Sequence, residues 1–146
     1  MSQNKYMYEA LKLANKAQEI NEVPVGCVIV DIKGEIIASG FNTNIRDLDP
    51  TAHAEVNAIR EACIKLNNER LVGCDLYITL EPCIMCAAVI SRAKIRRLYY
   101  GADDLIYGAV NGNVNSRTPS LGRCRRITTA SPISISLNRL TTYKSL

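Results

Sequence analysis

The chain has 146 residues, of which 47% are hydrophobic and 22% charged, and its formal net charge is +4. These values are typical of one globular domain with an ordinary core, and the lack of any apolar run of roughly 18 residues excludes a membrane-spanning chain. The first residues lack the apolar segment of a signal peptide, so we expect a cytoplasmic location with reduced cysteines and no membrane.

The first half of the chain predicts a helix followed by a hairpin. Residues 4–20 place alanine and leucine at helical spacing. After an interruption at Pro24, residues 27–30 predict a buried strand, and residues 35–40 predict its return strand beyond a turn at Lys33-Gly34. A polar loop then leads to a second helix over residues 52–66, which Asn67-Asn68 can end.

The second half continues the alternation of strands and helices. Residues 75–80 and 95–100 predict strands, and Pro82 suits the first position of a short apolar helix between them. This order implies a partly parallel, largely buried sheet with helices on its faces, an α/β fold. Farther on, residues 126–129 predict a final strand and residues 131–146 a last helix capped at Ser131.

Positive charge gathers near the end of the chain. The last acidic residue is Asp104, and six cationic residues follow it: Arg117, Arg123, Arg125, Arg126, Arg139 and Lys144. A basic segment suits a polyanionic partner such as nucleic acid. Arginines scattered over a solvated surface would give the same pattern, so charge alone leaves both interpretations open.

A single histidine and two cysteines have the spacing of a metal site. Cys83 and Cys86 lie three residues apart at a predicted helix start, so both thiolates can approach one ion at about 2.3 Å, as zinc prefers. His53, at the start of another helix, can supply a third ligand. Three protein ligands leave the fourth tetrahedral position open, which is typical of catalytic zinc.

Glu55 is the predicted proton carrier beside this site. Residues two apart on a helix do not face one another, so His53 and Glu55 can share a site only beyond the helix end. Zinc lowers the pKa of a coordinated water to about 7, and a glutamate can take that water's proton and return it to the substrate. His-x-Glu followed by Pro-Cys-x-x-Cys is a signature of zinc-dependent nucleobase deaminases.

Each part of the pattern also has a simpler interpretation. A lone Cys-x-x-Cys can be a redox pair or half of a structural zinc site. Glu55 can be a solvated residue of a first helical turn, and His53 can be a cap histidine. We predict core positions for Cys27 and Cys63, whereas a four-cysteine structural site through Cys74 or Cys124 would leave His53 and Glu55 unexplained.

Longer stretches resemble the bacterial tRNA-specific adenosine deaminases of the cytidine deaminase superfamily. The matching stretches are residues 22–26, 49–55, 77–86 and 100–102, and the likeness covers roughly residues 4–112. The resemblance implies one deaminase domain over residues 1–146, with a family-like catalytic core at 1–112 and an atypical segment at 113–146. It also implies a three-layer α-β-α fold whose central mixed sheet has five strands flanked by helices.

The resemblance further implies a chemistry and a set of roles. The family converts adenosine to inosine at the wobble position of a tRNA anticodon and is usually a homodimer. By match, His53, Cys83 and Cys86 bind Zn2+ and Glu55 shuttles protons. Substrate contacts are expected from the Asn42 side chain, the Ala54 backbone amide and the Asp104 side chain, although Asn42 can equally form a turn and Asp104 can cap a helix.

The end of the chain departs from the family pattern. After Asn111 there is no histidine, acidic residue or phenylalanine, where the family has a histidine-containing strand and an acidic helix that grips RNA. Two alternatives to a tRNA substrate therefore stay open. One is deamination of a free nucleobase, nucleoside or nucleotide of the cytosine or guanine type, and the other is a non-catalytic, zinc-containing RNA-binding module.

Overall fold

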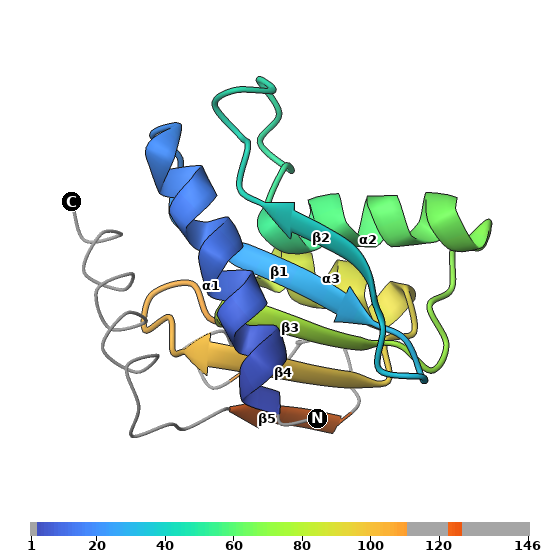
Figure 1. The fold of residues 1–146 in the computed structure, drawn as a ribbon. Helices are drawn as coiled ribbons and strands as arrows, with labels where there is room; N and C mark the ends of the chain where they lie inside the picture. Colours follow the sequence, from blue (N-terminus) through green and yellow to red (C-terminus); the bar gives the residue numbers. More distant parts are fainter. Residues whose placement is uncertain (1–2, 111–122, 127–146) are drawn as a thin grey trace.

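The computed structural model describes residues 3–110 and the backbone of residues 123–126. Figure 1 shows three layers, with one helix on one face of a sheet and two helices on the other, so the predicted three-layer α/β arrangement is confirmed. Within residues 3–110, no helix is long and apolar enough to cross a membrane. The elements in chain order are α1 (Gln3–Glu19), β1 (Gly26–Val30), β2 (Ile36–Phe41), α2 (Ala54–Leu66), β3 (Asp75–Leu80), α3 (Ile84–Arg92), β4 (Arg97–Ala102) and β5 (Arg123–Arg126).

The sheet is mixed, with the strand order β2-β1-β3-β4-β5. β1 runs antiparallel to both β2 and β3, whereas β3, β4 and β5 are parallel to one another. Side chains are described for the first four strands, and β5 is described by its backbone alone. β5 begins three residues before the predicted final strand, and residues 127–129 and the predicted helix 131–146 lie outside the described residues.

Two glycines let the helices approach the sheet closely. A Cβ at Gly26 of β1 would lie 1.9 Å from the carbonyl oxygen of Ala10 in α1, and one at Gly40 of β2 would lie 2.5 Å from the carbonyl oxygen of Ala54 in α2. Buried alanines at four-residue spacing face these contacts from both helices. The close packing fixes where α2 begins relative to the sheet, and α2 begins beside the site described below.

The start of α3 differs from its prediction. We expected Pro82 in the first helical position, but the helix begins at Ile84 and Cys83 is its N-cap with an extended backbone. The reason is a long-range contact, because the N–H of Ala109 donates to the Pro82 carbonyl at 2.9 Å and keeps this segment extended. Glu81 precedes a proline, and the proline ring clashes with an α-helical conformation of the residue before it. Glu81 is therefore biased toward extended structure.

Candidate active site

α2 presents His53 and Glu55 from its N-terminal end. His53 is the N-cap residue, with φ −73° and ψ 158°, and its side chain makes no capping hydrogen bond. Glu55 lies in the first helical turn and is 4% exposed. Both side chains can therefore reach a point beyond the end of the helix, as the two-residue spacing requires.

Hydrogen bonds within the preceding loop fix the approach to His53. The Asp49 carboxylate accepts the N–H of Thr51 at 2.8 Å and its hydroxyl at 2.7 Å. The hydroxyl bond is the main cause of a lowered pKa at Asp49. The Asn44 side-chain amide donates to the carbonyl oxygens of Asp49 and Pro50. These bonds join the start of the loop to the residues just before His53.

α3 presents the two cysteines in the same way. Cys83 is the N-cap residue of α3, also without a side-chain capping bond, and Cys86 is fully buried in the first turn. Unpaired N–H groups at a helix N-terminus carry partial positive charge, which favours a thiolate.

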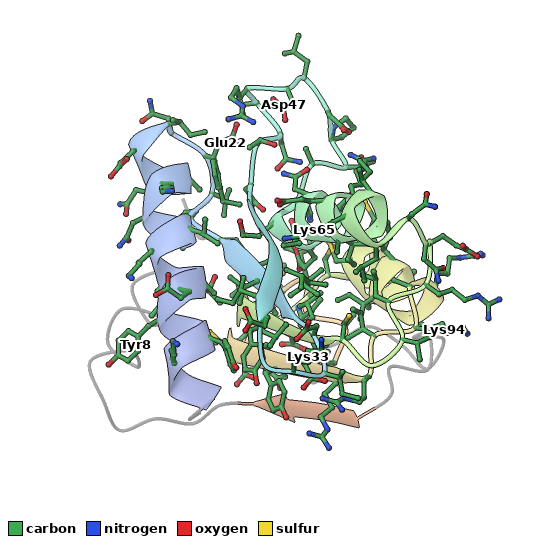
Figure 2. All side chains as sticks on the ribbon, turned by 45° about the vertical axis from the view of Figure 1, so that its right-hand side comes forward. Tyr8, Glu22, Lys33, Asp47, Lys65 and Lys94 are labelled. Atoms are coloured by element: carbon green, nitrogen blue, oxygen red, sulfur yellow. The ribbon has the colours of Figure 1, made fainter. Side chains whose placement is uncertain are left out.

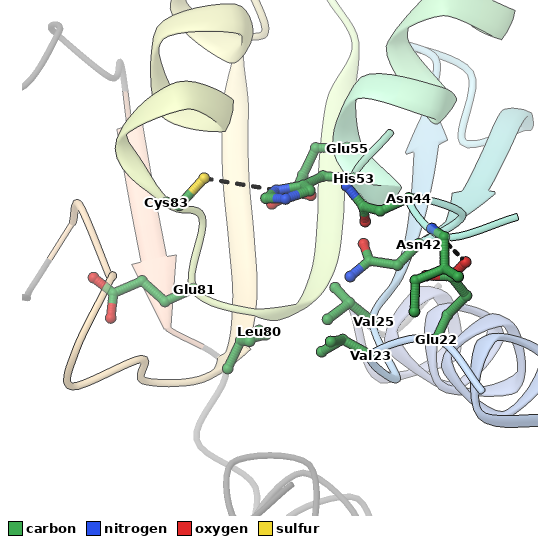
Figure 3. Close-up of a pocket in the computed structure, with 11 residues that line it drawn as sticks. Glu22, Val23, Val25, Asn42, Asn44, His53, Glu55, Leu80, Glu81 and Cys83 are labelled. Atoms are coloured by element: carbon green, nitrogen blue, oxygen red, sulfur yellow. Dashed lines mark hydrogen bonds between the residues drawn. The ribbon is translucent and has the colours of Figure 1, made fainter. Parts of the chain in front are cut away.

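The three candidate ligands come together at one point, and Figure 3 shows two of them, His53 and Cys83. His53 Nδ1 lies 3.7 Å from Cys83 Sγ and 3.3 Å from Cys86 Sγ, and all three ligand atoms lie within 4.8 Å of one another. Tetrahedral zinc with ordinary Zn–N and Zn–S bonds separates its nitrogen and sulfur ligands by about 3.6 Å. The two observed distances lie on either side of that value, so these residues fit zinc and leave one coordination position for another ligand.

The two sulfurs have opposite pKa shifts because they share a hydrogen bond. This bond, with a second one from His53, lowers the pKa of Cys83 to about 4, although burial opposes the shift. The same bond and burial raise the pKa of Cys86. A coordinated divalent cation removes the proton from a thiol, so both sulfurs can act as thiolate ligands.

Glu55 is suited to carry a proton beside these ligands. Burial is the main cause of its raised pKa, and the negative charge of Cys83 adds to the shift. A carboxyl group whose pKa lies closer to neutrality can both accept and return a proton during a reaction. The geometry of the site is therefore compatible with the predicted acid–base role of Glu55, which stays a prediction.

A pocket of about 270 Å³ opens beside the candidate ligands (Figure 3). Pockets for drug-sized molecules occupy roughly 300–1,000 Å³, so this one suits a smaller group such as a single base. Apolar side chains form part of its wall, and the polar groups converge from both helices and the loops. The lining residues are Glu22, Val23, Val25, Asn42, Asn44, Ile45, His53, Glu55, Leu80, Glu81 and Cys83.

Asn42 and Ala54 contact one another at the pocket wall. The Ala54 N–H donates to Asn42 Oδ1 at 2.8 Å, which directs the Asn42 Nδ2 away from this bond. The Ala54 N–H can therefore reach a substrate only after Asn42 turns away from it. The predicted contact between the Ala54 N–H and substrate stays a prediction.

Asp104 lies in the loop after β4 (residues 103–110) rather than among the residues that line the pocket. Its Oδ1 accepts the N–H groups of Ile106 and Tyr107 at 3.1 and 3.0 Å, and the residue is 7% exposed. These bonds cap a turn, whereas the alternative that we considered was an exposed aspartate that caps a helix. The predicted contact between Asp104 and substrate stays a prediction.

Two buried glutamates at the pocket are missing from our sequence predictions. Glu22 accepts the N–H groups of Ile45 and Arg46, each at 2.8 Å, and Figure 2 shows it below the loop that carries Asp47. Glu81 accepts N–H groups of the loop after β4 on the opposite side. Both glutamates therefore hold a loop through its backbone N–H groups. A glutamate next to an apolar strand is the sequence signal for this role, because it is expected to be buried and a buried carboxylate needs hydrogen-bond donors.

The other cysteines lie away from the three ligands. Cys27 is fully buried, as predicted, whereas Cys63 is half-buried and packs against the core. Cys74 is buried, and among the described residues it belongs to no metal-binding group. Cys124 is in β5, where only its backbone is described.

Comparisons with known proteins agree with this geometry. Residues 1–102 match the family described as the cytidine and deoxycytidylate deaminase zinc-binding region. A tRNA-specific adenosine deaminase from Agrobacterium fabrum is 54% identical over 109 residues, covering 75% of this chain and 71% of the relative. His53, Glu55, Cys83 and Cys86 all lie within the segment that matches the family.

Solved structures extend the likeness to the fold. One comes from work on A-to-I editing by tRNA:A34 deaminases at the wobble position of transfer RNA. It is 47% identical with a TM-score of 0.80, and the match covers 85% of this chain and 98% of that one. A guanine deaminase from Bacillus subtilis is 29% identical with a TM-score of 0.69, covering 100% of this chain and 96% of that one.

Proposed function

Because this chain belongs to the cytidine and deoxycytidylate deaminase zinc-binding family, we propose that it converts adenosine to inosine at the wobble position of a tRNA anticodon. The reaction is a zinc-dependent hydrolytic deamination. The observation that carries the choice of substrate is the 54% identity over 109 residues with a tRNA-specific adenosine deaminase.

In this proposal each residue of the site has a separate task. His53 Nδ1 and the sulfurs of Cys83 and Cys86 hold the zinc. When bound, zinc lowers the pKa of a water molecule and so supplies hydroxide at neutral pH. The Glu55 carboxylate would accept one proton from the attacking water and return it to the ring nitrogen. It would then take the second proton, from the hydroxyl now on the ring carbon, and pass it to the amino group, which leaves as ammonia.

The small size of the pocket supports a substrate whose target base leaves the base stack and enters the protein. Bases in an anticodon loop are unpaired, so inserting one into a closed pocket costs less than extruding a base from a duplex. In this proposal Asn42 Nδ2 donates to the inserted base while Asn42 Oδ1 accepts the Ala54 N–H. Asp104 contributes through the shape of its loop. A direct contact between the Ala54 N–H and substrate would require Asn42 to turn away, so it is an alternative to the Asn42 contact and not an addition to it.

We further propose a homodimer located in the cytoplasm, where a tRNA substrate is found. Large apolar side chains are exposed at the start of α3 and in the neighbouring loop: Ile84 is 48% exposed, Leu105 78% and Ile106 61%. Such a group of exposed apolar residues is typical of a protein interface. Each protomer would be one domain, with a catalytic core at residues 1–112, a distinct segment at 113–146 and a five-stranded sheet completed by β5.

Sedimentation of the purified chain tests the assembly. We expect a species of twice the 16.1 kDa of one chain. Leu105→Asp should shift the equilibrium toward the monomer, because it places a charge in the proposed interface. Val72→Asp, at a residue that is 76% exposed on a different loop, is the control and should leave the dimer intact. Sedimentation as a monomer at micromolar concentration would contradict the proposal.

A substrate panel tests the function. The purified chain is offered an anticodon stem-loop with adenosine at the wobble position, the same stem-loop with guanosine there, and free adenosine, cytosine and guanine. We expect inosine from the first substrate and no turnover of the others. Turnover of guanine alone would establish the free-base alternative, which the 29% identity to a guanine deaminase favours over a cytosine substrate. Zinc retention without any turnover would indicate the non-catalytic RNA-binding module.

A further inference from the structure

Glu81 lines the pocket, yet its carboxylate does not face the reacting groups. Figure 3 shows the side chain turned away from His53 and toward the loop after β4. The residue is 2% exposed. Its Oε2 accepts the N–H of Asp104 at 3.0 Å and its Oε1 accepts the N–H of Val110 at 2.8 Å. One carboxylate therefore binds the loop near both of its ends.

The backbone around Glu81 pairs with the end of β4 and with the loop that follows it. The N–H of Glu81 donates to the Ala102 carbonyl at 2.8 Å, and the N–H of Ala109 donates to the Pro82 carbonyl at 2.9 Å. Cys83 itself forms an isolated β-bridge with Gly108. Residues 81–83, which end in a candidate zinc ligand, and residues 104–110 are thus joined by both side-chain and backbone hydrogen bonds.

Gly108 permits this contact because it has no side chain. A Cβ at this position would lie 2.3 Å from Glu81 Oε2 and 2.4 Å from the carbonyl oxygen of Asp104. The backbone of the loop therefore passes directly against the carboxylate. Any larger residue at position 108 has to displace either the Glu81 side chain or the loop.

We propose that Glu81 is a positioning residue that holds Cys83 in place for zinc by fastening the loop after β4 to the turn before α3. This inference rests on the proposed zinc site. Glu81 acts through the backbone, since its carboxylate accepts backbone N–H groups of the loop. Groups that hydrogen-bond directly to a metal ligand typically change metal affinity about 10–100-fold when they are replaced, and we expect an effect of similar size here.

Glu81→Gln tests the proposal with little change of shape. Glutamine offers an amide NH₂ in place of one carboxylate oxygen, so the N–H of Asp104 or that of Val110 loses its acceptor. We expect zinc release to a chromogenic chelator to become at least about tenfold faster. Hydrogen exchange of the amides at residues 104–110 should also become faster, and this second measurement needs neither zinc nor substrate.

Asp75→Asn is the matched control, because it removes a buried carboxylate from the start of β3, whereas Glu81 directly follows the end of that strand. Asp75 forms a two-bond ion pair with Arg96, with both N···O distances 2.9 Å. The strand rise places residues 75 and 81 roughly 20 Å apart. Asp75→Asn should lower the thermal unfolding midpoint while leaving the rate of zinc release unchanged.

Gly108→Ala provides an independent variant in which Glu81 is intact but crowded, and it should also release zinc faster. The proposal is overturned if Glu81→Gln lowers the unfolding midpoint as Asp75→Asn does and releases zinc at the rate of the unmodified chain. It is likewise overturned if Gly108→Ala folds and keeps that rate. If the unmodified chain holds no zinc, the zinc site fails first, so the two failures can be told apart.

Discussion

Replacement of Glu55 by alanine is expected to lower the rate of inosine formation about 10²–10⁴-fold, the usual contribution of a general acid–base group. Glu55 is buried at the pocket, and burial raises its pKa, which suits a group that accepts and returns a proton. The zinc content should stay unchanged, because His53, Cys83 and Cys86 supply the ligands without Glu55. Single-turnover kinetics on the anticodon stem-loop and elemental analysis of the same sample measure the two quantities.

Glu61→Ala is the control for this variant. Glu61 lies on the same helix but is exposed, and its carboxylate accepts the N–H of Ser39 at 3.1 Å. Surface substitutions of this kind alter stability by only about 0.5 kcal/mol, so the fold and the site should stay intact. We therefore expect Glu61→Ala to change activity less than twofold. Unchanged activity in Glu55→Ala would remove Glu55 from the mechanism, and loss of zinc in that variant would assign it a ligand role.

Replacement of a zinc ligand is expected to remove both the metal and the activity. His53→Ala and Cys86→Ala should each reduce the zinc content from about one per chain to nearly none, because two remaining ligands form an incomplete site. Stability should fall as well, since the metal joins the ends of α2 and α3 and its binding free energy adds to that of folding. Elemental analysis, thermal unfolding and the stem-loop assay follow these three effects.

Cys63→Ala is the matched control for the cysteine variant. Cys63 is half-buried near the end of α2 and belongs to no metal-binding group among the described residues. This variant should keep its zinc and its activity. A Cys86→Ala chain that retained a full complement of zinc would contradict the ligand assignment. Removing zinc from the unmodified chain with a chelator, and then restoring it, should abolish and recover deamination.

Local sequence patterns predicted most of the fold because they reflect interactions between near neighbours. β3 was predicted residue for residue as Asp75–Leu80, where a run of β-formers is buried on both faces. The start of α3 was predicted two residues early because proline favours the first helical position. Its carbonyl instead accepts a hydrogen bond from Ala109, a residue 27 positions later, and no local pattern contains that contact.

The same distinction separates the predicted and unpredicted parts of the site. The four residues His53, Glu55, Cys83 and Cys86 are chemically distinctive and closely spaced in pairs, so their convergence could be predicted, and their roles stay predictions. The hydrogen bonds of Glu22 and Glu81 join residues 23–29 positions apart, which requires the folded topology. The bond between Asn42 and the Ala54 N–H was missed because both residues had been assigned to substrate.

Both helices that build the site begin at a residue that makes no side-chain capping bond, His53 for α2 and Cys83 for α3. Serine or asparagine at such a position typically stabilises a helix by about 1 kcal/mol. Neither would replace the lost imidazole or thiolate as a zinc ligand. The chain thus gives up folding stability at two helix ends in exchange for reactivity, a trade-off common in enzymes. A redesign guided by consensus or stability would replace these two residues with better helix caps. Each such substitution would stabilise a helix and remove a zinc ligand.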